Sequence, residues 1–123
     1  MKDQGRSARK RTGGRLKHAA NKKRHQLGRE PAETTVGETR LQYIDSRGTE
    51  KKVRALSTNV AQVADDGDIS EAEIENVVDN PANVNYVRRN IITKGALVET
   101  PKGTVRITNR PSQEGHALGV LVE

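Results

Sequence analysis

The 123-residue sequence contains no cysteine, tryptophan or phenylalanine, and tyrosine occurs only twice. Without cysteine, the chain has neither disulfide bonds nor thiolate metal sites, as is usual for intracellular proteins. Because aromatic side chains are so scarce, we expect a hydrophobic core made of Val, Ile, Leu and Ala. No apolar run approaches the roughly 20 residues of a membrane-spanning helix, so no membrane-spanning helix is predicted.

Residues that could perform chemistry are also scarce. The sequence has no nucleophile elbow, P-loop or dinucleotide-binding pattern. No carboxylate is placed by sequence to orient His18, His25 or His116, so we expect neither general-base catalysis nor metal ligation. The run from Asp65 to Asp68 resembles a cation-binding loop, but its glycine is misplaced for an EF-hand and no suitable Glu follows. We therefore predict a non-enzymatic protein with no cofactor, no metal and no small-molecule substrate.

Positive charge is concentrated at the start of the chain. The formal net charge is +6, yet residues 1–29 alone hold eleven Lys or Arg against one acid, Asp3. Apolar residues are few there, so this segment cannot bury enough surface to offset the entropy of ordering itself. It needs a polyanion, which indicates nucleic acid or an anionic membrane. The alternatives are a solvated tail and a mitochondrial presequence, and the break at Gly13-Gly14 argues against a presequence helix.

The basic segment, residues 1–29, is expected to form a region separate from a second domain at 30–123. Residues 1–14 should be an extended arm, in which Gly13-Gly14 makes a turn or a close approach to a phosphate or base. Residues 15–26 contain good helix formers and are expected to make a short helix that ends before Gly28. Lys and Arg of this segment would make charge-assisted hydrogen bonds to phosphates.

The second domain is predicted to be mainly β, with short antiparallel strands that close into a small barrel. The period of two in residues 39–56, around a turn at Asp45–Gly48, predicts a β-hairpin with a basic outer face. Turns rich in Gly and Pro separate the remaining strands, which are expected at residues 59–64, 91–93, 96–100, 104–108 and 117–122.

The stretch 65–79 is acidic and contains the clearest helix start. Ser70 and Glu73 match a capping box, so we expect one short inserted helix at residues 71–79. Pro81 would end it, because the residue before a proline avoids helical backbone angles. Such an acidic helix would mark the side of the domain that faces away from RNA.

Further cations cluster at turns and strand ends of the second domain, where a barrel presents its binding groups. Tyr86 near Arg88 either stacks on a base or is a half-buried core residue. Scarce aromatic side chains favour recognition of the shape and backbone of folded RNA over base stacking. The residues predicted to contact RNA are Arg6, Arg9, Lys10, Arg11, Thr12, Gly13, Gly14, Arg15, Lys17, Lys22, Lys23, Arg24, His25, Arg29, Arg47, Lys51, Lys52, Arg54, Arg88, Arg89, Lys94 and Arg110.

Long stretches of the chain resemble a known family. These stretches are RTGGRLK at 11–17, KKRHQLGREPAETTVG at 22–37, KKVRAL at 51–56 and YVRRNIITKGALVETPKGTVRITNRPSQEG at 86–115. They make nearly the whole chain similar to the e-type ribosomal protein eight family of the archaeal and eukaryotic small subunit. The resemblance implies a β-barrel body and a basic N-terminal extension. It implies RNA contacts at 11–15, 22–24, 27–29 and 88–90.

The resemblance also implies a function. A member of this family would be a structural constituent of the small ribosomal subunit that binds rRNA and stabilises its fold during assembly and translation. Its partners would be small-subunit rRNA and neighbouring small-subunit ribosomal proteins, with no membrane among them, and its location would be the ribosome in the cytoplasm. Two rivals stay open: a ribosome-assembly factor of related fold, and an RNA-processing enzyme, against which the lack of paired catalytic groups argues.

The acid load of residues 65–79 departs from the basic character of a ribosomal protein. It leads to the hypothesis of a salt-loving archaeal source, in which acidic surface residues hold water and cations. The basic segment would then rely less on counterion release, because that term weakens in concentrated salt.

Overall fold

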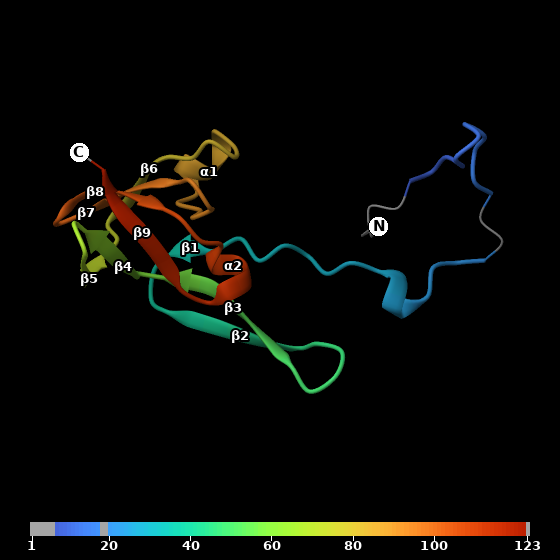
Figure 1. Ribbon diagram of the computed structural model, residues 1–123, viewed down its shortest axis with the longest axis horizontal. Helices are drawn as coiled ribbons and strands as arrows, with labels where there is room; N and C mark the ends of the chain where they lie inside the picture. Colours follow the sequence, from blue (N-terminus) through green and yellow to red (C-terminus); the bar gives the residue numbers. More distant parts are fainter. Residues whose placement is uncertain (1–6, 18–19, 123) are drawn as a thin grey trace. The chain divides into compact units, whose positions relative to one another are not determined.

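The computed structural model describes residues 7–17 and 20–122, which fall into two compact units, Met1–Pro31 and Ala32–Glu123 (Figure 1). Unit 1 carries one short 3₁₀ helix, η1 (Arg24–Gln26), whereas the strands β1 to β9 all belong to unit 2. The protein is therefore mainly β, as the sequence predicts.

The helix expected over residues 15–26 is reduced to η1, in which the Lys23 N–H donates to Gln26 Oε1 over 3.0 Å. His18 and Ala19 lie outside the described residues, and none of the described residues in this stretch is buried. A short helix is marginal in water without an apolar face to pack, and closely spaced cations repel one another along it. The helix prediction is therefore wrong for the described part of the stretch.

A three-stranded sheet with the order β1-β3-β2 begins unit 2. Its strands are β1 (Thr35–Val36), β2 (Arg40–Asp45) and β3 (Lys51–Thr58). Strands β2 and β3 pair antiparallel, so the hairpin predicted at residues 39–56 is confirmed. Strand β1 lies parallel to β3 on its other side.

A six-stranded sheet makes up the rest of unit 2, with the order β5-β4-β9-β8-β7-β6. Its strands are β4 (Val60–Asp65), β5 (Asp68–Glu73), β6 (Asn76–Asp79), β7 (Leu97–Thr100), β8 (Gly103–Ile107) and β9 (Ala117–Val122). All neighbours are antiparallel except β4 and β9, which are parallel. Four of the strands expected from the sequence are therefore found, whereas residues 91–93 contribute only a bridge between Ile91 and Thr35.

The two sheets do not close into a barrel within the described residues. Strands β5 and β6 end the six-stranded sheet, and both sheets contain one parallel pair. The mainly β class is thus correct, while an antiparallel barrel is not confirmed. Long-range parallel pairing has no local turn signal, because the paired segments are joined by long connections.

The helix expected at residues 71–79 is wrong, because this stretch forms the end of β5 and all of β6. Asp66 and Gly67 both have positive φ, 40° and 103°, as a tight two-residue hairpin turn requires. That turn places Ala72 opposite Ala61 of β4, and Ala72 is 8% exposed. The Asp-Gly hairpin signal therefore outweighs the capping pattern of Ser70 and Glu73.

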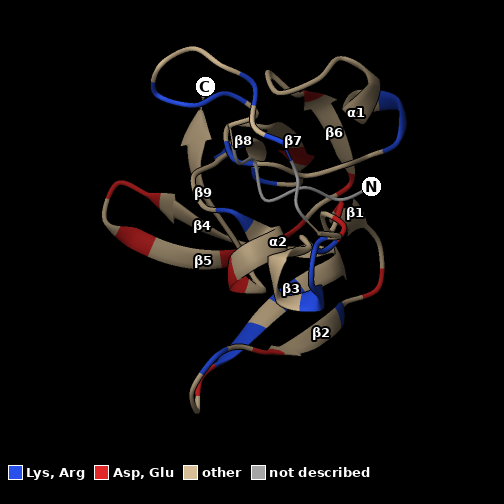
Figure 2. Ribbon diagram, turned by 90° about the vertical axis from the view of Figure 1, so that its right-hand side faces the viewer, with Lys and Arg blue, Asp and Glu red and all other residues tan. Residues whose placement is uncertain are grey.

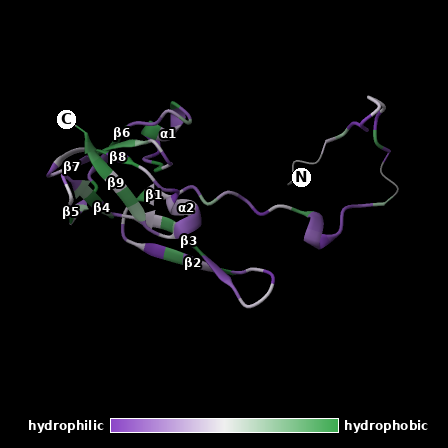
Figure 3. Cartoon of the chain, in the orientation of Figure 1, coloured by the Kyte–Doolittle hydropathy of each residue, from purple (hydrophilic) through white to green (hydrophobic). Residues whose placement is uncertain are grey.

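The core of unit 2 is aliphatic, as the composition predicts. It contains Ala61, Val63, Ala72, Ile74, Val77, Ile92, Val98, Val105, Ile107 and Ala117. Figure 3 shows this apolar character along the strands of unit 2, in contrast to the mostly hydrophilic residues of unit 1. Strand alternation places the core residues on one face of the six-stranded sheet and leaves the other face for solvent.

Buried hydrogen bonds of Thr34 link strand β3 to the segment before β7 where the chain enters unit 2. Thr34, which is fully buried, donates from Oγ1 to the Ala55 carbonyl over 2.6 Å. The Thr34 carbonyl accepts from the Ile92 N–H over 2.8 Å. One residue thus connects β3 to the segment before β7. This arrangement satisfies polar groups that would be costly to bury alone.

Two short helices complete unit 2, α1 (Asn85–Arg88) and α2 (Pro111–Glu114). Helix α2 starts at a proline and ends at Gly115, whose φ of 84° permits the chain to reverse. It packs against β3, with Gly115 beside Val53. Over the described part of the chain, no helix is both long and apolar enough to cross a membrane.

Candidate nucleic-acid interface

The predicted turn at Gly13 and Gly14 is present in unit 1. Gly13 has a φ of 88°, and the Lys10 N–H donates to the Gly14 carbonyl over 2.7 Å. Arg9 bridges Arg15 across the loop, and its Nη1 donates to the Gly13 carbonyl over 2.8 Å. The backbone therefore closes the loop through its own hydrogen bonds.

The side chains of this loop face solvent. Its exposed predicted contacts are Arg9, Lys10, Arg11, Thr12, Gly13, Gly14 and Arg15. Lys17, Lys23, Arg24, His25 and Arg29 are exposed too, whereas Lys22 is half-buried. Arg6 lies outside the described residues. On a small loop that is already closed, the cations can contact several phosphates of one nucleic-acid strand without any unfolding of the protein.

The β2–β3 hairpin carries the next group of predicted contacts (Figure 2). Lys52 and Arg54 lie on one face of the hairpin, because they pair with Ile44 and Gln42. Lys51 lies on the other face and forms an ion pair with Asp45 across 3.8 Å. Both side chains of that pair are mostly exposed, so solvent screens it.

Arg47 is exposed in the loop that joins β2 to β3. The Ser46 N–H donates to the Glu50 carbonyl over 3.1 Å, which closes the base of this loop. In Figure 1 the hairpin extends beyond the rest of unit 2. A narrow two-stranded projection with exposed cations on its loop and both faces can enter a groove between RNA helices.

Arg88 and Arg89 follow one another at the end of α1 but have different surroundings. Arg88 is exposed, whereas Arg89 forms an ion pair with Glu33. This pair joins the α1 region to the segment before β1, so Arg89 has a structural contact as well as its predicted RNA contact. Tyr86 is half-buried, which matches the core alternative for this side chain.

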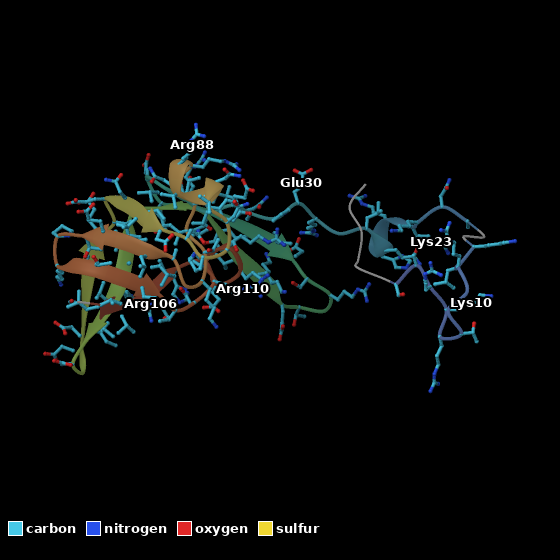
Figure 4. The ribbon with its side chains drawn as sticks, turned by 90° about the horizontal axis from the view of Figure 1, so that it is seen from above. Lys10, Lys23, Glu30, Arg88, Arg106 and Arg110 are labelled. Atoms are coloured by element: carbon cyan, nitrogen blue, oxygen red, sulfur yellow. The ribbon has the colours of Figure 1, made fainter. Side chains whose placement is uncertain are left out.

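The predicted cations of unit 2 do not form one continuous patch. Figure 4 shows Arg88 on one side of unit 2, and Arg106 and Arg110 on the opposite side. Lys94 is exposed in the turn before β7. The structure also exposes three cations that sequence reasoning left out of the contact set: Arg40, Lys102 and Arg106. For Arg106 the alternation of β8 was a usable signal, because Val105 and Ile107 beside it are buried.

No metal-binding cluster of His, Asp or Glu occurs within residues 7–17 and 20–122. The predicted contact residues described above offer charge and hydrogen bonds. Exposed guanidinium and ammonium groups bind phosphate oxygens, so this arrangement is suited to a nucleic-acid backbone.

The chain matches the family model described as Ribosomal protein S8e over residues 3–122. It is 78% identical to the small ribosomal subunit protein eS8 of Halorubrum lacusprofundi, over the full length of both chains. It is 68% identical to the protein of the same name from Haloquadratum walsbyi, over all of this chain and 98% of the relative. The protein of that name from Haloarcula marismortui is 59% identical over the full length of both. The resemblance seen in the sequence is thus confirmed, and the chain belongs to the ribosomal protein S8e family.

Proposed function

We propose that this protein is a non-enzymatic structural constituent of the small ribosomal subunit that binds rRNA and stabilises its fold. The observation that carries this function is full-length membership of the ribosomal protein S8e family. The relatives are named small ribosomal subunit proteins. As a component of that subunit, the chain would act in the cytoplasm beside other subunit proteins.

The basic segment, residues 1–29, is the main rRNA anchor. It holds eleven of the 22 Lys and Arg of the chain, and its described part has no buried side chain. Such a segment gains order when phosphates neutralise its charge. The loop closed by the Arg9–Arg15 bridge presents Arg11 and Arg15 on a backbone that is already closed.

Residues 30–123 form the body, which adds a second set of contacts. Within this set the β2–β3 hairpin supplies Arg47, Lys51, Lys52 and Arg54, the end of α1 supplies Arg88, and loops supply Lys94 and Arg110. These side chains meet phosphates of different rRNA segments, since they lie on several sides of the body. Arg89 contributes mainly by holding Glu33.

The test compares the full chain with a variant that lacks residues 1–29. Both are added during reconstitution of small subunits, and incorporation is measured by co-sedimentation. We expect the truncated chain to remain folded by circular dichroism and to lose incorporation. Normal incorporation of the truncated chain would mean that the basic segment is not the anchor. Recovery of the full chain from mature, translating subunits distinguishes a constituent from an assembly factor.

A further inference from the structure

The outer face of the six-stranded sheet carries an exposed apolar row. Ile69 of β5 lies opposite Ala64 of β4, and Ala64 lies opposite Val120 of β9. Ile69 is 76% exposed and Val120 is 46% exposed. Residues paired across neighbouring strands project from the same side of a sheet, so these three side chains adjoin one another.

The row is not an extension of the core. Val63 and Gly119, one residue before Ala64 and Val120, point to the opposite side, where Val63 is 1% exposed. On the outer side, β9 adds the half-buried Leu118 and Val122. An apolar surface that spans three adjacent strands gains free energy when a partner covers it.

Acidic side chains lie at the β5 end of this apolar row, whereas Arg106 of β8 lies opposite Val120 at its other end. Asp65 and Asp68 flank the turn between β4 and β5, and Glu71 and Glu73 share the outer face of β5 with Ile69. Figure 2 shows the acids along β5 and its turn. Residues 55–87 contain no Lys or Arg. The field around β5 and its turn therefore repels phosphates.

Hydration of the protein surface explains the acids but leaves the apolar row without a role. Water gains nothing from an exposed Ile69, whereas a partner with both apolar and cationic side chains complements the β5 end of this face. Charge complementarity therefore selects a basic polypeptide over RNA, even though RNA is the partner of the basic surfaces elsewhere in the chain.

Strand β5 gives such a polypeptide a place to bind. It is the outermost strand of the sheet, so its outward backbone N–H and C=O groups can pair with an added strand. In an added strand, every second side chain projects from the outer face. One such side chain would lie beside Ile69 and the next beside Glu71. The matching pattern is an apolar residue and a cation two positions apart.

We propose that the outer edge and outer face of β5, at the acidic end of the apolar row, form a docking site for an extended, Lys- and Arg-rich segment of another small-subunit protein. The segment adds to the outer edge of β5, covers Ile69 and pairs its cations with Glu71 and Glu73. This inference rests on the proposed function, because it places the partner within the same subunit.

The test uses the absence of cysteine in the natural chain. Ile69→Cys introduces one thiol in the full chain, which is labelled with a benzophenone maleimide and assembled into small subunits. Illumination should join this position to a Lys- and Arg-rich peptide of one other subunit protein, identified by mass spectrometry. The matched control is Val84→Cys, at a position 83% exposed just before α1, which should not give that adduct.

Other products would overturn the docking site. These products are an adduct with rRNA, an adduct with residues 1–31 of the same chain, equal adducts from the Val84→Cys control, and no protein adduct. Incorporation of the unaltered chain into subunits is measured first and tests the proposed function separately. If the unaltered chain is absent from subunits, that function fails. If it is present and Ile69→Cys gives none of the expected adduct, only the docking site fails.

A charge reversal tests the role of the acids. Glu71→Lys together with Glu73→Lys should lower the yield of the Ile69→Cys adduct by about fivefold, because two cross-strand charge pairs change sign. Asp79→Lys together with Glu99→Lys is the control, since it changes the net charge equally at exposed positions of β6 and β7. If both double variants lost the adduct equally, the loss would be due to net charge alone, which would contradict a site at β5.

Discussion

Two turns in this protein each contain a glycine with positive φ, but the residues around one turn are cationic and those around the other are acidic. Gly13 closes the cationic loop of unit 1 with a φ of 88°, and Gly67 closes the acidic β4–β5 hairpin with a φ of 103°. Beneath the acidic hairpin lie the buried side chains Val63 and Ala72. None of the described residues of the cationic loop is buried.

This difference distinguishes the role of exposed charged residues from the role of buried apolar residues. Exposed charge selects the partner, so the cationic loop attracts phosphates and the acidic hairpin excludes them. Burial of apolar side chains decides whether a segment is stable before its partner binds. The described part of unit 1 has no buried side chain, and we propose that it depends on rRNA for order, whereas unit 2 has its own core. Changes on each side of this comparison should therefore have distinct effects.

The largest effect on stability is expected from a substitution in the buried core of unit 2. Ile107 is 1% exposed, and Ile107→Ala should lower the free energy of unfolding by ~2–5 kcal/mol through lost burial and a residual cavity. Denaturant titration followed by circular dichroism measures this change. Ile69→Ala makes the same chemical change at an exposed position and should stay within about 0.5 kcal/mol. Equal losses at the two positions would contradict the core described for unit 2.

The next effect concerns rRNA affinity. Replacing Lys10, Arg11 and Arg15 with Gln should reduce the slope of log affinity against log salt by about 3, because each lost phosphate contact removes about one released counterion. Filter binding to small-subunit rRNA at several salt concentrations measures the slope. The matched control replaces three exposed cations of unit 2, Arg40, Lys102 and Arg106, with Gln. If that control reduces the slope equally, the loop has no special part in anchoring.

A smaller effect should follow from strain in the loop. Gly13→Ala puts a side chain at a φ of 88°, which costs ~1–2 kcal/mol in the left-handed region, although the new Cβ meets no neighbour within 4 Å. Affinity for rRNA should fall up to about tenfold if the closed loop is the binding form. Gly14→Ala is the control, since Gly14 is not left-handed and its Cβ would lie 3.9 Å from Thr12 Oγ1. Unchanged affinity in Gly13→Ala would show that RNA binds the opened loop.

The smallest effect concerns how the stability of the acidic β4–β5 hairpin depends on salt concentration. Asp65 and Asp68 lie directly opposite each other in the β4–β5 hairpin, where like charges destabilise a sheet. Raising KCl from about 0.1 to about 2 M should screen them and increase the free energy of unfolding of the full chain by ~0.2–1 kcal/mol. The variant with Asn at 65, 66 and 68 should gain less. A chain whose stability is indifferent to KCl would contradict both this screening and the salt-loving interpretation of the acids.

Local signals in the sequence predicted local structure well. The β2–β3 hairpin followed from alternation around a turn, and the loop at Gly13-Gly14 from paired glycines among cations. The helix at 71–79 failed because Ser70 and Glu73 satisfy a capping pattern that pairing with β4 overrides. The Asp66-Gly67 turn was the informative signal, since both residues adopt positive φ.

Long-range features could not be predicted in the same way. The parallel pairing of β4 with β9 places Ala61 opposite Ala117. No local pattern in either segment predicts that these two strands are neighbours. The apolar row on the outer face depends on this pairing, since Val120 lies beside Ala64 only in this register. The ion pair of Arg89 with Glu33 likewise depends on the folded position of α1.

Strand β9 has a consequence for the order in which the chain acquires structure. Among the described strands, it pairs with both β4 and β8 and so links the β4–β5 hairpin to the β8-β7-β6 part of the sheet. It is also the last of these strands in chain order. During synthesis the six-stranded sheet therefore cannot be completed until residues 117–122 have been made. The cationic loop near Gly13 emerges far earlier and needs no distant segment for its backbone bonds, so it can meet rRNA while the body is still incomplete.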